Sequence, residues 1–331
     1  MHIRSYSIRI FLLLQLLVPS TLFANDHSII VKFTDPNVEM VKPEKWHKKQ
    51  IKYGKWAKGA DLVVTLDQHL YPTFLPMIKK YAKQNSIDIA VREGTCGTSE
   101  GLVNKKQVDI AGYCCAPSLT DRLPGLEFHT IGIAALAVLV NPDNPVKNLT
   151  TQQVRDIFRG KITNWNQIEP EHGEKRLNLP IRPVGRLHCK VRPGHWRLIL
   201  DNEDEFSPAL VEVGQISNMI SVVAEYKGAI GYEVLWNLTR FKEEGEAKAV
   251  LVNNISPYND AAVAQGKYPF YRVDNVTTWR DSHLANTNAK NLVNYIREKS
   301  VNTKDEFALI PEDSLRKNGW KFKGNELIGE P

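Results

Sequence analysis

The sequence lacks the features that mark several large classes of protein. It has no block of Lys and Arg interleaved with aromatic residues, and its net charge is only +6 over 331 residues, which argues against a nucleic-acid partner. It has no internal repeat and no low-complexity segment. The apolar run at residues 10–18 is too short to span a bilayer comfortably, and no later run is long enough either. We therefore expect no integral membrane segment in the mature chain.

The N-terminus predicts export. Arg4 and Arg9 give it a basic start, the apolar run follows, and the run ends at the small residue Ala24. This is the pattern of a secretory signal peptide at residues 1–24. No cysteine lies near the cut site, so lipid anchoring is not indicated. We expect the mature protein to be periplasmic or secreted after the signal peptide is removed.

Apolar strands alternate with helices along most of the chain, which predicts an α/β fold with parallel sheets and helices on both faces. Residues 25–60 are polar, rich in Lys and without a clear period, and we interpret them as an irregular extension. The segment 136–196 is the most readable, with a strand at 136–140, a helix at 150–158 and a polar loop that should open another helix. Further strands are predicted at 61–66, 87–92, 107–112, 128–140, 228–232, 249–252 and 269–273, and further helices at 72–81, before 104, at 219–224 and at 289–299.

Five blocks of sequence, taken in order, resemble the substrate-binding proteins of phosphate-type ABC transporters. They lie at residues 93–102, 109–117, 135–165, 183–186 and 228–232. The most specific are the turn Asn-Pro-Asp-Asn-Pro, the run Ile-Phe-Arg-Gly-Lys-Ile-Thr-Asn-Trp and the strand Gly-Ala-Ile-Gly-Tyr, because they occur together at similar spacing in that family. With the helices between them, these blocks cover most of residues 61–297.

The resemblance implies a periplasmic-binding-protein class 2 fold, in which two α/β lobes joined by a hinge close on a ligand. One lobe would contain residues 61–140 plus 257–331, and the other would contain residues 141–256. The ligand loops of that family lie at helix N-termini, where unpaired N–H groups attract an oxyanion. The implied function is the capture of a small ligand, foremost a phosphate-like oxyanion, for an ABC transporter permease, without catalysis and without a required cofactor.

The loops expected to face the ligand differ from the family in their chemistry. Histidine or cysteine stands at places where the family has Gly, Ser or Thr, while Arg186 keeps its position. Arg186 can bind an oxyanion through two N–H groups, and we expect Glu100 to point away from such a ligand. The predicted ligand-binding residues are His69, Thr95, Cys96, Gly97, Thr98, Cys114, Cys115, Arg186, His188, Cys189, Arg192 and His195.

The four cysteines of the chain all fall on these loops, and three alternatives stay open. In an exported protein, Cys96 or Cys189 would form a disulfide with Cys114 or Cys115, or those two adjacent residues would form a strained bridge. A soft-metal site for Cu, Zn or Fe would use Cys96, Cys114, Cys115, Cys189, His188 and His195, although no Cys-x-x-Cys motif is present. The third alternative is a thiol-bearing pocket for an unusual solute or a redox role.

An enzyme with Cys189 as nucleophile and His188 or His195 as base is disfavoured. Adjacent residues seldom have the required orientation, and no acidic third member is evident in the sequence. We therefore expect no enzymatic activity.

Overall fold

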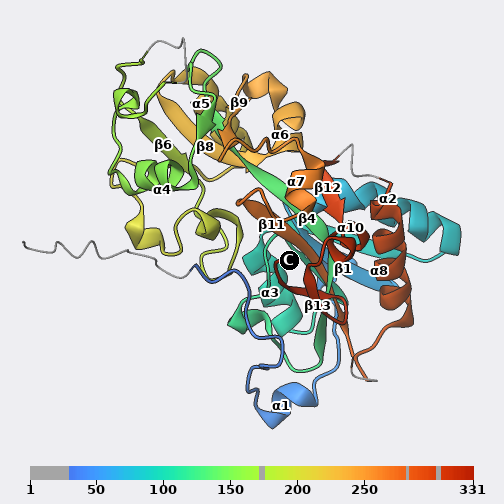
Figure 1. Cartoon of the computed structure of the whole chain (residues 1–331). Coiled ribbons are helices and arrows are strands. Elements are labelled where there is room, and N and C mark those ends of the chain that lie inside the picture. Colours follow the sequence, from blue (N-terminus) through green and yellow to red (C-terminus); the bar gives the residue numbers. More distant parts are fainter. Residues whose placement is uncertain (1–29, 171–175, 281–282, 303–306) are drawn as a thin grey trace, which may run out of the picture.

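The protein is described by a computed structural model that covers residues 30–170, 176–280, 283–302 and 307–331 (Figure 1). The predicted signal peptide lies outside these residues. Two groups of helices and strands are seen in Figure 1, and the long strands β4 (Leu126–Val140) and β11 (Tyr271–Trp279) occupy the middle of the molecule. The α/β fold class is confirmed. Among the described residues, no helix combines the length and the apolar composition that crossing a membrane requires.

The remaining elements follow the alternating order expected from the sequence. The strands are β1 (Leu62–Asp67), β2 (Ile89–Gly94), β3 (Ile110–Tyr113), β5 (Asn148–Leu149), β6 (Arg182–Gly185), β7 (Val211–Glu212), β8 (Ala229–Val234), β9 (Lys248–Ala249), β10 (Leu251–Val252), β12 (Leu309–Pro311), β13 (Lys321–Lys323) and β14 (Glu326–Gly329). The α-helices are α1 (Glu44–His47), α2 (Leu70–Asn85), α3 (Cys96–Asn104), α4 (Thr151–Arg159), α5 (Ile216–Glu225), α6 (Leu235–Arg240), α7 (Asp260–Ala264), α8 (Thr287–Ser300) and α10 (Glu312–Lys317). The 3-10 helices are η1 (Lys55–Ala57), η2 (Leu119–Asp121), η3 (Trp165–Gln167), η4 (His195–Leu198), η5 (Glu203–Glu205) and η6 (Lys242–Glu244).

One sheet runs through both groups of elements, in the order β2-β1-β3-β11-β4-β8-β6-β7. Its outer strands are parallel, as predicted, since β1 pairs in parallel with β2 and β3, and β6 with β7 and β8. The prediction of parallel sheets is wrong for the centre, where β11 is antiparallel to β3 and to β4, and β8 is antiparallel to β4. The cause is the length of β4, because its first part pairs with β11 and its last five residues pair with β8.

Helix α4 illustrates how local sequence determines an element. Thr150 and Gln153 form a capping box, in which each side chain accepts a hydrogen bond from the backbone N–H of the other. The helix ends at Gly160, whose φ of 77° lies in the left-handed region that glycine adopts without strain. Its buried face is apolar and includes Phe158. The predicted helix at 150–158 is therefore confirmed within one residue at either end.

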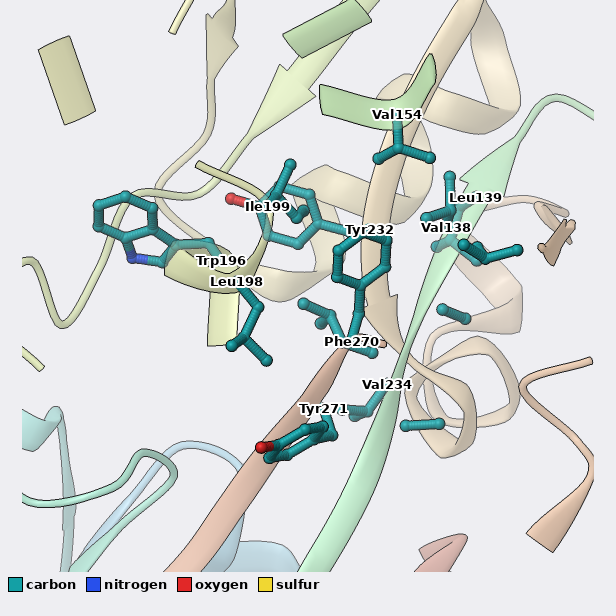
Figure 2. Close-up of a cluster of buried hydrophobic side chains, with 14 of the residues drawn as sticks. Val138, Leu139, Val154, Trp196, Leu198, Ile199, Tyr232, Val234, Phe270 and Tyr271 are labelled. Carbon is teal, nitrogen blue, oxygen red and sulfur yellow. The ribbon is translucent and has the colours of Figure 1, made fainter. Parts of the chain in front are cut away.

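The segment after the polar loop packs into the core without forming the α-helix that the sequence predicts. Figure 2 shows Trp196, Leu198 and Ile199 in one cluster with side chains of β4 and β8, the Trp196 ring lying on the side away from β4. All three are buried, but the segment is only the short 3-10 helix η4. The reason lies in the backbone at the start of the segment, since Gly194 has a φ of 82° and His195, the first residue of η4, a φ of 54°, values that are incompatible with an α-helix. The core thus fixes the end of this loop in place.

Candidate functional site

A cavity of about 380 Å³ lies where the loops that follow β1, β2, β3 and β6 meet. Its lining residues are Asp67, Gln68, His69, Thr95, Cys96, Gly97, Glu100, Cys114, Arg186, His188, Cys189, Lys190, Val191 and Arg192. Nine of the twelve predicted site residues are among them. The other three, Thr98, Cys115 and His195, lie outside the lining; Thr98 is half-buried, whereas Cys115 and His195 are buried.

The N-terminus of α3 forms one wall of the cavity. Thr95 is its N-cap, and the Thr95 hydroxyl accepts a hydrogen bond from the backbone N–H of Thr98 at 3.2 Å. This leaves the N–H groups of Cys96 and Gly97 without an acceptor inside the helix, as at the start of any α-helix. Gly97 carries no side chain, and the nearest atom to a Cβ placed there would be 3.7 Å away. A ligand can therefore approach the backbone at this point.

Arg186, which directly follows β6, lines the cavity from another loop and is 5% exposed. Its Nε donates a hydrogen bond to the backbone oxygen of Gly214, its Nη2 donates to Gln68 Oε1 at 2.6 Å, and its Nη1 lies 3.1–3.3 Å from the ring nitrogens of His188. Within the described part of the chain, no carboxylate lies within ion-pair distance of this guanidinium. Its orientation is thus fixed by neutral groups, and its charge has no direct ion-pair partner among the described residues; buried Glu233 interacts with it at longer range.

Arg192 also lines the cavity, but its charge is already paired. Its Nη2 lies 2.6 Å from Asp121 Oδ1 and 2.9 Å from Glu100 Oε2. The expectation that Glu100 points away from the site is wrong, because this carboxylate turns inward to reach Arg192. Arg192 is bound to two carboxylates and Arg186 to none, so the two arginines of the loop differ in their electrostatic surroundings.

The four cysteines are brought together at the floor of the cavity as free thiols. Cys96 is the first residue of α3, the pair Cys114 and Cys115 follows β3, and Cys189 lies in the loop after β6. The four sulfur atoms all lie within 4.8 Å of one another, with 3.6 Å between Cys96 and Cys114 and 3.8 Å between Cys114 and Cys115. Of the three alternatives left open by the sequence, the disulfide is not the one that this structure describes, because the bond needs sulfur atoms about 2.05 Å apart.

Only one of these thiols is set up to lose its proton easily. Hydrogen bonds donated by Cys114, Cys115 and Cys189 to its sulfur lower the pKa of Cys96 well below the usual value. The pKa of Cys115 is raised, because its thiol donates a hydrogen bond to a neighbouring sulfur and is buried, and both effects favour the protonated form. Cys96 is therefore the thiol of the cluster whose surroundings most favour the thiolate form.

Three histidines lie beside the thiols, and their ring centroids are separated by 4.6 to 5.9 Å. Burial lowers the pKa of His69 to about 4, and burial with the charge of Arg186 lowers the pKa of His188 to about 3. Both rings are neutral at pH 7. His69 donates through Nε2 to Glu233 Oε1 at 3.1 Å, and the ring nitrogens of buried His195 have no hydrogen-bond partner among the described residues. His69, Cys114 and His188 form a second group of ligand atoms within 4.8 Å.

Sequence reasoning missed several residues of the site, most of them beside residues that it had identified. Asp67 and Gln68 precede His69 in the first loop, and Glu233 lies at the end of β8. Asp67 accepts hydrogen bonds from the backbone N–H groups of His69 and Leu70, and burial raises its pKa to about 7. The polar turn after β1 was the one sign in the sequence that Asp67 and Gln68 belong to the site. Their roles could not be read from it, because they depend on contacts with distant loops.

Comparison with known proteins agrees with this architecture. Residues 54–299 match the PBP superfamily domain. The chain is 24% identical over 255 residues to the phosphate-binding protein PstS of Bacillus subtilis, which covers 75% of this chain and 79% of that protein. It is 22% identical over 312 residues to protein SphX of Synechococcus elongatus, covering 82% of this chain and 88% of the relative.

A solved structure shows the same fold. The ABC-type phosphate transport receptor from Vibrio cholerae aligns with a TM-score of 0.61 and 22% identity, covering 76% of this chain and 99% of that one. The family match extends over most of the chain and includes nearly every element that surrounds the cavity. This protein therefore belongs to the PBP superfamily.

Proposed function

We propose that this chain is an exported, non-catalytic solute-binding protein that captures a small oxyanion, phosphate or a close analogue, in the cavity at the N-terminus of α3. The observation that carries the proposal is the buried guanidinium of Arg186. It lines the cavity, and no carboxylate of the described residues forms an ion pair with it, although buried Glu233 interacts with its charge at longer range. A buried and unpaired charge is costly, so an anionic ligand at this place completes the site.

The donors around Arg186 leave room for such a ligand. A guanidinium has five N–H groups, and three of them are directed to Gly214, Gln68 and His188. Two N–H groups remain for oxygen atoms of an anion. The N–H groups of Cys96 and Gly97 add further donors and the positive end of the α3 dipole, a combination that favours negatively charged oxygen atoms.

Two of the carboxyl groups that line the cavity, those of Glu100 and Asp67, oppose an anion only weakly. Glu100 and Asp121 are both bound to Arg192, so Glu100 adds little repulsion. The raised pKa of Asp67 leaves this group substantially protonated at neutral pH, and a protonated carboxyl can donate a hydrogen bond to an oxygen of the ligand. His69 and His188 are neutral. We therefore leave Arg192 out of the anion site and assign recognition to Arg186 and α3.

The names of the relatives support the same ligand class and suggest a partner. PstS is named a phosphate-binding protein, and the Vibrio cholerae protein a phosphate transport receptor of the ABC type. We infer that this chain delivers its ligand to an ABC transporter permease in the periplasm or at the cell surface. Residues 61–140 with 257–331 and residues 141–256 would be the two lobes, and cavity closure would be a rotation between them.

Anion binding by the purified mature chain tests the proposal. Thermal unfolding is followed with millimolar phosphate, arsenate, sulfate or molybdate, with chloride at matched ionic strength as the control. A ligand present at 100 times its Kd should stabilise the protein by about 2.7 kcal/mol, which is an increase of several degrees in Tm. If every oxyanion leaves the Tm at the chloride value, the oxyanion proposal fails.

A further inference from the structure

The four thiols have an arrangement that an anion site does not need. Arg186 and the α3 N–H groups account for the recognition of an oxyanion, whereas Cys115 lies outside the cavity lining and still belongs to the cluster. Cys96, Cys114 and Cys115 are each 1–2% exposed, and Cys189 covers them at the edge of the cavity. Four sulfur atoms from three separate segments therefore meet at one point inside the protein.

We propose that Cys96, Cys114, Cys115 and Cys189 bind one Zn²⁺ ion as a tetrathiolate site that joins the loop after β6 to the N-terminal part of the chain. A tetrahedral zinc ion with Zn–S bonds of about 2.3 Å holds its sulfur ligands about 3.8 Å apart. The separations of 3.6 Å and 3.8 Å around Cys114 agree with that value. A set of four sulfur ligands in tetrahedral geometry is characteristic of structural zinc.

The backbone at two places directs the sulfur atoms inward. Adjacent residues of a strand point to opposite faces of the sheet, but β3 ends at Tyr113, so Cys114 and Cys115 lie in the bend after it and both reach the cluster. Cys189 has a φ of 55°, in the left-handed region that L-residues other than Asn and Asp rarely adopt. Such strain is retained where a side chain has a specific task, and here it turns the thiol toward the other three.

Positively charged side chains lie near the cluster, where a zinc ion with four thiolates would have a net negative charge. Four thiolates with one Zn²⁺ have a net charge of −2, and each thiol that binds releases its proton. Two buried arginines lie beside the cluster, and each is also paired with a carboxylate. Arg192, which binds Asp121 and Glu100, has its Nη2 3.5 Å from the backbone oxygen of Cys96. Arg272, which pairs with Asp274, acts electrostatically on Cys114. The Nη1 of Arg272 has no hydrogen-bond partner among the described residues, so it remains available to stabilise that charge.

The ion would position the ligand-binding loop. Three of its ligands precede β4, and the fourth, Cys189, lies three residues after Arg186. A bound ion therefore fixes the distance between α3 and the loop that carries Arg186, the two walls of the anion cavity. Zinc binding itself does not depend on the proposed function, and the two properties are measured separately.

Metal titration of the reduced, metal-free mature chain tests the site. Zn²⁺ is added in competition with a chromophoric chelator, and Co²⁺ is used as a spectroscopic substitute. We expect one ion per chain and the charge-transfer bands of tetrahedral thiolate-bound Co²⁺. C189S, at the least buried cysteine, and C115S, outside the cavity, should each weaken zinc binding by more than about 100-fold, since loss of even an outer hydrogen-bond partner costs 10- to 100-fold.

H69Q is the discriminating control, because His69 belongs to the alternative group with Cys114 and His188 and not to the tetrathiolate. It should keep both the stoichiometry and the Co²⁺ spectrum. Metal binding that survives C115S and C189S but is lost in H69Q would overturn the proposal. So would a chain that binds no Zn²⁺ while its four thiols are titrated as free, or one that purifies with two of the four cysteines in a disulfide.

Discussion

Replacing Arg186 by glutamine is expected to weaken oxyanion binding by about 150-fold. The guanidinium has two N–H groups that are not used by Gly214, Gln68 or His188. A hydrogen bond from a charged donor contributes about 1.5–3 kcal/mol, so the loss of two at the lower value is about 3 kcal/mol. Since 1.4 kcal/mol is a factor of ten in Kd, the expected change is about 150-fold.

Isothermal titration calorimetry with the anion that stabilises the parent chain measures this change. R159Q is a matched control, because Arg159 is an arginine of α4 that pairs with Glu205 at 2.6 Å and takes no part in the cavity lining. R186K keeps the charge but loses the two-pronged geometry, so its affinity should lie between those of R186Q and the parent chain. If R186Q binds the anion as tightly as R159Q does, the assignment of recognition to Arg186 is wrong.

Three further predictions concern the loop and the fold. Zn²⁺ should slow tryptic cleavage after exposed Lys190, which follows Cys189, and C189S should remove this protection; equal rates with and without Zn²⁺ would contradict the proposed clamp. T150A should lower the free energy of unfolding in urea by about 1 kcal/mol because it removes the cap of α4, and an unchanged midpoint would contradict that role. Burial lowers the pKa of His129 to about 4, whereas the pKa of a histidine in the unfolded chain is about 6.5. The neutral ring therefore contributes at most about 3 kcal/mol of stability above pH 6.5, and this contribution is lost as the pH falls toward 4. H129Q should flatten this part of the pH profile of the free energy of unfolding.

The sequence is sufficient for elements whose start and end have local causes. The helix α4 has its capping box and its terminal Gly160, and β8 begins directly after Gly228. The centre of the sheet could not be predicted in this way. Whether β4 and β11 run parallel or antiparallel depends on pairing between residues more than a hundred positions apart, and no local pattern encodes that choice.

In the site too, features determined by the order of the elements were predictable, and features determined by tertiary contacts were not. The loops were predicted correctly, and nine of the twelve named residues line one cavity, because the order of strands and helices determines which loops meet. The partners of individual side chains were not predictable, since they depend on tertiary contacts. The inward turn of Glu100 requires Arg192 from a loop ninety residues later. The free thiols, in place of a disulfide, depend on separations that the sequence does not contain.

The most direct test of the central claim is a crystal structure of the mature chain with arsenate, whose anomalous scattering identifies the anion without ambiguity. We predict one arsenate in the cavity, with its oxygen atoms about 2.7–3.2 Å from the guanidinium of Arg186 and from the backbone N–H groups of Cys96 and Gly97. An arsenate bound elsewhere while this cavity holds none, or an anion whose only contacts are to the thiols, would contradict it.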